Sequence, residues 1–271
     1  MPRFASLVCA VVALGVSASV QGGTVIVTSP EGTFTNAGPN NATGPGAGFD
    51  TWYANNVRNG GSVGITSTYP DAGNGSIEFS GPANAKADFE YYFSPNNTFL
   101  LSSLTAFSYD KYRSSTSTAG VQYEPALRLA VSDGTYSGYL VYEGIYNGQP
   151  VAPLNTFTTA NVLPAFVWGT GNLPGNFSVY NRTIADWVAL LPNLKVYGLS
   201  TGIGSGWNGS FAGAVDNITY GVNGGDPTTF NFEVPAVATP EPTTLALAAS
   251  GLVVLGVRQF RRRARVGTPA R

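Results

Sequence analysis

The sequence has no histidine among its 271 residues, and its single cysteine is Cys9. Without histidine there is no His-dependent catalytic triad, no histidine general base and no histidine-ligated metal site. One cysteine excludes an intramolecular disulfide and an all-cysteine zinc site. Charged residues are scarce as well, at 11% of the chain, whereas a soluble domain usually has about 25%.

Glycine and proline are abundant instead, with 34 and 18 residues, and aromatic residues make up 12% of the chain. This composition favours short strands and many turns over a helical bundle. Apolar and polar residues alternate in several segments, such as Phe89, Tyr91 and Phe93 around Asp88 and Glu90. Further strands are expected at 24–28, 76–80, 104–109, 126–131, 138–146, 177–180, 194–199, 214–220 and 230–234. We therefore predict an all-β protein, with a jelly-roll-like, antiparallel two-sheet β-sandwich over residues 23–234.

One short helix is expected within this domain. An apolar face with helical spacing is formed by Ile184, Trp187, Val188 and Leu191. Thr183 and Asp186 are spaced as a capping box, and Pro192 ends the run. We expect this helix to close one end of the sandwich, with Trp187 turned inward.

Charge is unevenly distributed along the chain. Residues 24–240 contain seven Lys and Arg against fourteen Asp and Glu, a net charge of −7, and six arginines follow between Arg258 and Arg271. An acidic body repels phosphate backbones, so we do not expect a nucleic-acid partner.

Residues 1–22 have the pattern of a secretory signal peptide. Arg3 provides the positive start, residues 7–16 are an uninterrupted apolar run, and small residues such as Ser17 and Ala18 follow. The alternative is a buried N-terminal helix. Cys9 lies inside the apolar run, so we expect it to be removed with the signal.

The C-terminal end combines three features. Pro240, Glu241 and Pro242 lie in a proline-rich linker at 235–243, an uncharged apolar stretch follows, and arginines end the chain. Residues 243–257 would form a helix of about 22 Å at about 1.5 Å per residue, which is short of a hydrocarbon core of about 30 Å. If the Arg258 side chain extends towards the headgroups, residues 244–260 reach the minimum length of a transmembrane helix. The positive-inside rule then makes Arg261, Arg262 and Arg263 the stop-transfer cluster of a cytoplasmic tail at 261–271.

This arrangement closely resembles the PEP-CTERM sorting signal of Gram-negative bacteria. The same segment is also known as an ice-binding protein C-terminal domain, but the body shows no internal repeat that could build a regular threonine array. The resemblance implies an exosortase-type transpeptidase as partner, with cleavage near Pro240, Glu241 and Pro242. It also implies transfer of an exported, inner-membrane-anchored protein to the cell envelope or an exopolysaccharide matrix. The alternative is an ordinary linker before an unprocessed membrane anchor.

Residues 202–234 are similar to the end of laminin-B-like and carbohydrate-binding-module-like jelly-roll domains. The resemblance implies that the strand with Asp216 and Asn217 pairs with a closing strand around Phe230 and Phe232. It also implies a glycan-binding or calcium-stabilised sandwich.

Two ligand hypotheses follow for the body. Asp216 is a candidate Ca²⁺ ligand, with Glu31 or Asp50 as partners, because extracellular sandwiches hold this ion through carboxylates and carbonyls; the alternative is a strand aspartate that caps a turn. Trp52 and Trp207 are candidate glycan-stacking residues, because they lie among Gly and Asn residues typical of loops; the alternative is that both belong to the core.

We therefore expect an exported, non-catalytic envelope or matrix protein without a required cofactor, and a carbohydrate-binding module as the alternative. A glycoside hydrolase needs two carboxylates and no histidine, so composition does not exclude it. No paired acidic motif supports it, however.

Overall fold

The computed structural model describes residues 22–28, 33–34 and 49–235. The chain divides into two compact units, Met1–Val234 and Pro235–Arg271. The predicted signal peptide, nearly all of the linker, the sorting motif, the transmembrane helix and the basic tail lie outside the described residues. Within those residues, no helix is long and apolar enough to cross a membrane.

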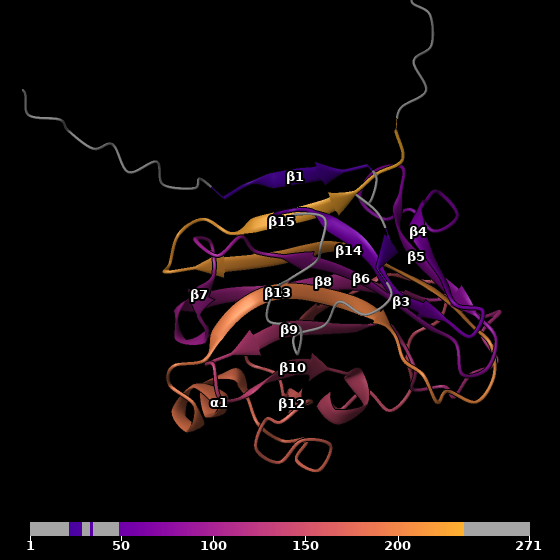
Figure 1. Ribbon diagram of the computed structural model, residues 1–271. Helices are drawn as coiled ribbons and strands as arrows, with labels where there is room; N and C mark the ends of the chain where they lie inside the picture. The colour runs from indigo at the N-terminus through magenta and orange to yellow at the C-terminus, as the bar shows by residue number, and fades with distance from the viewer. Residues whose placement is uncertain (1–21, 29–32, 35–48, 236–271) are drawn as a thin grey trace, which may run out of the picture. The chain divides into compact units, whose positions relative to one another are not determined.

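The described part of Met1–Val234 is built from two β-sheets (Figure 1). Sheet 1 has the order β1-β15-β14-β5-β4, with β8 on the other edge of β14 and β11 beside β8. Its strands are β1 (Thr24–Val27), β4 (Ser62–Thr66), β5 (Ser76–Gly81), β8 (Leu104–Arg113), β11 (Thr158–Asn161), β14 (Phe211–Val222) and β15 (Thr228–Phe232).

Sheet 2 has the order β12-β10-β9-β13-β6-β3-β2, with β7 also paired to β13. Its strands are β2 (Thr33–Phe34), β3 (Trp52–Arg58), β6 (Lys86–Tyr92), β7 (Phe99–Leu100), β9 (Ala126–Ser132), β10 (Ser137–Tyr142), β12 (Trp168–Gly169) and β13 (Lys195–Ile203). Two short 3₁₀ helices, η1 (Leu101–Ser103) and η2 (Gly144–Asn147), lie in the connections.

The predicted all-β sandwich with one short helix is confirmed. Most strand pairs are antiparallel, and two edge pairs, β1 with β15 and β2 with β3, are parallel. The closing strand pairs with β14 as the resemblance implied, since Ile218 lies opposite Phe230.

The core lies between the sheets and is rich in aromatic rings. Trp52 stacks on Phe89 with ring centroids 5.5 Å apart, and the edges of Phe230 and Phe232 meet the indole at 5.3 Å and 5.1 Å. These rings come from β3, β6 and β15, so the cluster joins the two sheets. Edge-to-face and offset pairs of this kind add to the free energy gained by burial.

The helix α1 (Ile184–Leu190) forms as predicted. The Thr183 hydroxyl accepts from the Asp186 N–H, and the Asp186 carboxylate accepts from the Thr183 N–H, which completes the capping box. Trp187 is fully buried, and its indole N–H donates to the Val167 carbonyl at 3.0 Å.

Two strand predictions need correction. Residues 177–180 do not form a strand, because Phe177 has φ +52°, outside the extended region. The segment predicted at 138–146 ends as a strand at Tyr142, and η2 follows.

Candidate functional site

Both tryptophans predicted to stack on glycans lie in the core. Trp52 is 2% exposed and is surrounded by the rings described above. Trp207 is 8% exposed, stacks on Tyr123 at 4.7 Å and meets Phe211 at 5.0 Å. Neither indole has an open face for a sugar, so this part of the glycan prediction is corrected.

Asp216 lies at an irregularity of β14, where the edge of this strand passes from β5 to β15. Its carboxylate accepts from the backbone N–H groups of Asn217 at 2.8 Å, Phe232 at 3.0 Å and Ala72 at 3.4 Å. Asp50 bonds instead to Ser94 and Asn97, and Glu31 lies outside the described residues. Within the described ranges, no three acidic, Cys or His side chains are grouped to hold a metal ion. Calcium binding at Asp216 stays a prediction.

The loop that bonds to Asp216 through Ala72 also bonds to the residues at the end of the domain. The Glu233 carboxylate accepts from the Asn74 N–H at 2.5 Å, and the Val234 N–H donates to the Asn74 side chain at 3.1 Å. Gly73 has φ +129° and lies so close to Glu233 that a Cβ would overlap the carboxylate. The residues directly after β15 are therefore held by the loop between β4 and β5.

The face of sheet 2 that points away from the core carries a row of paired residues. The row crosses five neighbouring strands, with one residue on each. In order these are Trp168 on β12, Val141 on β10, Arg128 on β9, Ser200 on β13 and Glu90 on β6. Four strand spacings of about 4.8 Å make this row about 19 Å long. It has an aromatic end at Trp168 and a polar end at Glu90.

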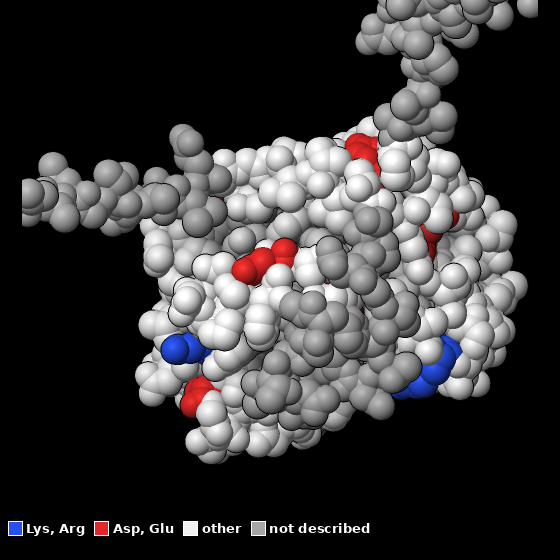
Figure 2. All heavy atoms as spheres, turned by 45° about the horizontal axis from the view of Figure 1, so that its top comes forward, with Lys and Arg blue, Asp and Glu red and all other residues white. Residues whose placement is uncertain are grey.

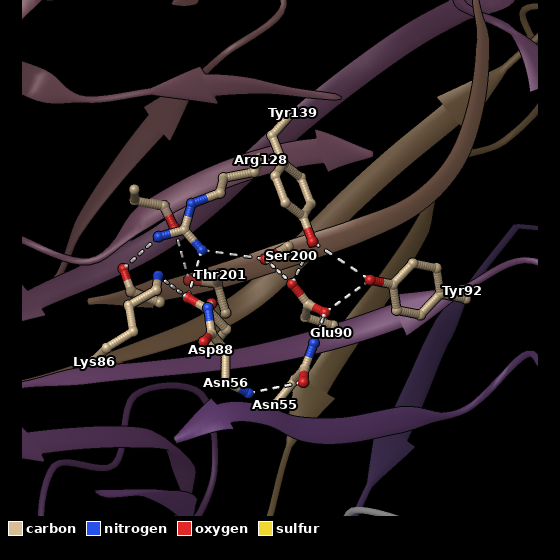
Figure 3. A network of polar contacts seen from close by, with 12 residues as sticks. Asn55, Asn56, Lys86, Asp88, Glu90, Tyr92, Arg128, Tyr139, Ser200 and Thr201 are labelled. Atoms are coloured by element: carbon tan, nitrogen blue, oxygen red, sulfur yellow. Dashed lines mark hydrogen bonds and ion pairs between the residues drawn. The ribbon is translucent and has the colours of Figure 1, made fainter. Parts of the chain in front are cut away.

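The polar end is a buried hydrogen-bonded network (Figure 3). Glu90 accepts from Tyr92 at 2.8 Å, Tyr139 at 2.8 Å, Ser200 at 3.0 Å and the Asn55 amide. Arg128 pairs with Asp88 at 2.7 Å, and Lys86 pairs with the same carboxylate. Arg128 is 8% exposed and Glu90 1% exposed. Asp88 is paired with two cations and Glu90 accepts from four neutral donors, so each buried carboxyl has hydrogen-bond partners.

The two carboxyl groups of this network, Asp88 and Glu90, have pKa values that are shifted in opposite directions. Burial would raise the pKa of Asp88, but Arg128 and Lys86 outweigh burial and hold it below its ordinary value. Burial, and then the neighbouring Asp88 charge, raise the pKa of Glu90. Burial lowers the pKa of Lys86 to about 8.

The aromatic end is a surface cluster formed by Tyr146, Trp168, Phe177 and Tyr180. Tyr146 stacks on Tyr180 at 4.3 Å, and Trp168 meets Phe177 at 5.4 Å and Tyr180 at 5.8 Å. Phe177 is 60% exposed and Tyr146 36% exposed. The indole N–H of Trp168 donates to Glu143 at 3.0 Å.

This aromatic cluster is held in place by hydrogen bonds within its loops. Asn147 donates to the Phe166 carbonyl at 3.0 Å and accepts from the Phe166 N–H at 2.8 Å. The Tyr180 hydroxyl donates to the Phe177 carbonyl at 2.9 Å. Burial raises the pKa of Glu143, so the carboxyl beside the indole is less readily charged.

The sequence did not single out this cluster. Trp168 follows Phe166 and Val167, so its surroundings predict a core position, and Phe177 and Tyr180 lie in a segment predicted as a strand. Two aromatic residues in the Gly-, Pro- and Asn-containing stretch 171–182, Phe177 and Tyr180, are the sequence signal that would have indicated it. Charged groups are few and scattered on the face shown in Figure 2.

A family of protein-sorting motifs, PEP-CTERM, matches residues 238–263. The chain therefore carries a PEP-CTERM sorting motif, as the resemblance predicted, and this motif indicates an exported protein sorted through its C-terminal end. No curated protein matches the chain.

Among solved structures, the chain is similar to two family 11 carbohydrate-binding modules. One, from Clostridium thermocellum in complex with a beta-1,3-1,4-mixed-linked tetrasaccharide, is 12% identical with a TM-score of 0.36, covering 68% of this chain and 91% of that one. The other, from cellulase Lic26A-Cel5E of Clostridium thermocellum, is 14% identical with a TM-score of 0.35, covering 67% and 89%. At this level of similarity the likeness carries no information about the ligand of this chain. No enzyme family is indicated.

Proposed function

We propose that this chain is an exported, non-catalytic protein that an exosortase-type transpeptidase cleaves near Pro240, Glu241 and Pro242. The product is then retained in the cell envelope or extracellular matrix of a Gram-negative bacterium. The observation that carries this proposal is the sorting motif at 238–263, a short distance after the last strand of the sandwich. Because proline restricts φ and favours an extended backbone, we expect an enzyme to recognise Glu241 as a single charge between two rigid residues.

Processing is tested by intact mass of the protein recovered from its native envelope. We expect the wild-type protein to lack its C-terminal tail, and to keep it in a strain without the transpeptidase. Glu241→Gln should also keep the tail, because the recognised charge is gone. Asp226→Asn, a matched loss of an exposed carboxylate in the turn before β15, should leave processing unchanged. Retention of the tail by the wild-type protein in its native host would reject this function.

A second candidate function is carbohydrate binding at the aromatic cluster. The observation that favours it is the exposed aromatic surface at Tyr146 and Phe177, beside Trp168 and the Glu143 carboxyl. Aromatic faces stack on the apolar faces of pyranose rings, while nearby polar groups bond to hydroxyls. A glycan ligand, including an exopolysaccharide of the producing cell, fits such a surface.

Glycan binding is tested on an array of neutral and acidic polysaccharides, followed by titration of any ligand found. Phe177→Ala should weaken binding about tenfold, equivalent to about 1.4 kcal/mol, with little effect on folding because the ring is exposed. Tyr69→Ala, which removes a ring stacked on Tyr112 on sheet 1, is the matched control and should bind normally. Equal binding by both variants, or no binding by the wild-type protein, would reject the aromatic cluster as a glycan site.

A further inference from the structure

Three side chains that neither function uses meet between the sheets. Lys111 comes from β8 of sheet 1, Glu124 lies just before β9 of sheet 2, and Gln149 follows η2. The Lys111 ammonium pairs with the Glu124 carboxylate and donates to the Gln149 carboxamide oxygen at 2.8 Å. Lys111 is 2% exposed and Glu124 6% exposed, so this pair is buried, while Gln149 is half-buried.

The three groups converge on one point of the backbone. A Cβ on Gly144 would lie within 3.2 Å of a side-chain atom from each of Lys111, Glu124 and Gln149. Only glycine leaves room for them. Because Nζ lies 2.8 Å from the carboxamide oxygen, and a C=O bond is about 1.2 Å long, Nζ is at most about 4 Å from the carboxamide carbon.

The surroundings favour the neutral forms of the amine and the acid. Burial lowers the pKa of Lys111 and raises the pKa of Glu124. A neutral amine is a nucleophile, and a carboxyl that can take and return a proton activates both the nucleophile and its target.

We propose that Lys111 and Gln149 become joined by an intramolecular isopeptide bond, with Glu124 as the acid and base of the reaction. The Lys111 amine attacks the Gln149 carboxamide carbon and forms the new C–N bond. Glu124, as the neutral acid, gives its proton to the carboxamide oxygen. As the carboxylate it then takes the proton that the amine releases and passes it to the leaving nitrogen, and it recovers its own proton when the new amide forms. The original C–N bond of the carboxamide breaks, ammonia leaves, and no oxidant or co-reactant is consumed.

Such a bond would close a covalent loop that starts on β8 of sheet 1 and includes β9 and β10 of sheet 2. Lys111 belongs to sheet 1, and Gln149 lies beyond β10 of sheet 2, 38 residues further along the chain. The cysteine content excludes an intramolecular disulfide. An isopeptide bond would supply the same kind of constraint on the unfolded chain without any thiol.

The test is peptide mapping of the purified full-length chain after digestion with trypsin. We expect no cleavage after Lys111 and a linked pair of peptides, one with Lys111 and the other with Gln149. Its mass should be lower than the sum of the two by about 17 Da, the mass of ammonia. Separate, unmodified peptides from the wild-type protein would overturn the proposal, whatever the variants do. A loss of about 18 Da, the mass of water, would place the bond at Glu124 and overturn the assignment to Gln149.

Two variants test the roles of the residues. Glu124→Gln keeps the amine and the carboxamide but removes the acid, and should give unlinked peptides. The linked pair in this variant would overturn the role of Glu124. Lys195→Met, a change at an exposed lysine, is the matched control and should leave the linked pair intact.

Discussion

At the residue scale, Asp216 shows how one buried carboxyl can couple stability to pH. Its side chain accepts hydrogen bonds from two segments distant in sequence, the end of β15 at Phe232 and the loop at Ala72. Burial, the largest influence, raises its pKa from 3.8 to about 7, and the hydrogen bonds only partly oppose this rise. Burial, with the neighbouring Asp110, also raises the pKa of Asp71, to about 6.

The consequence is a loss of stability as pH increases. Between pH 3.8 and about 7 the unfolded chain has released the Asp216 proton while the folded protein still holds it. The free energy of unfolding therefore falls across this window, by on the order of 1.4 kcal/mol for each pKa unit of difference. Asp216→Asn keeps an oxygen that accepts from Phe232 and Asn217 but cannot ionise. We expect urea unfolding of this variant to vary less with pH than the wild type, by about 2 to 4 kcal/mol between pH 4 and 8.

Asp226→Asn is the control, because this carboxyl is exposed. Its unfolding free energy should follow the wild-type pH dependence. A steep, unchanged pH dependence in Asp216→Asn would show that other carboxyls, such as Asp71, account for the effect.

At the element scale, the sequence predicted those helices and strands whose positions depend on interactions between residues close together in the chain. The helix at 184–190 could be located from Thr183, Asp186 and Pro192 because capping depends on residues three positions apart. Most strands followed from alternation. The strand β3 was missed because Trp52, Tyr53, Ala54 and Asn55 are all buried, so both faces are covered and polarity does not alternate.

The candidate site could be predicted only in part, for the same reason. Gly- and Asn-rich flanks indicate that Trp52 and Trp207 lie near loops, but ring burial depends on distant partners such as Phe230 and Tyr123. The sorting motif, by contrast, is a contiguous pattern and could be recognised directly. Contacts between distant segments, such as that of Lys111 with Gln149, have no signature along the sequence.

The cap of α1 gives a prediction at this scale. Thr183→Ala removes the side chain that accepts from the Asp186 N–H, and should lower the free energy of unfolding by about 1 kcal/mol. Thr135→Ala, at an exposed turn before β10, should change it by less than about 0.5 kcal/mol. Chemical denaturation of both variants measures the difference. Equal effects would mean that packing of Trp187, rather than the cap, fixes the start of the helix.

At the scale of the whole molecule, one edge of sheet 1 is formed by β1, which runs parallel to β15. β15 lies between β1, which runs parallel to it, and β14, which runs antiparallel. Glu233 and Val234, which follow β15, are bonded to the loop at Asn74, and the sorting motif matches from residue 238 onwards. The chain therefore leaves the domain from a strand that is bonded along both sides.

This placement determines how the domain bears a mechanical load. A pull along β15 loads the perpendicular hydrogen bonds to the antiparallel β14 and the slanted hydrogen bonds to the parallel β1. Both ladders are then loaded in shear. A surface protein tethered through this end would resist drag on the cell with both ladders at once.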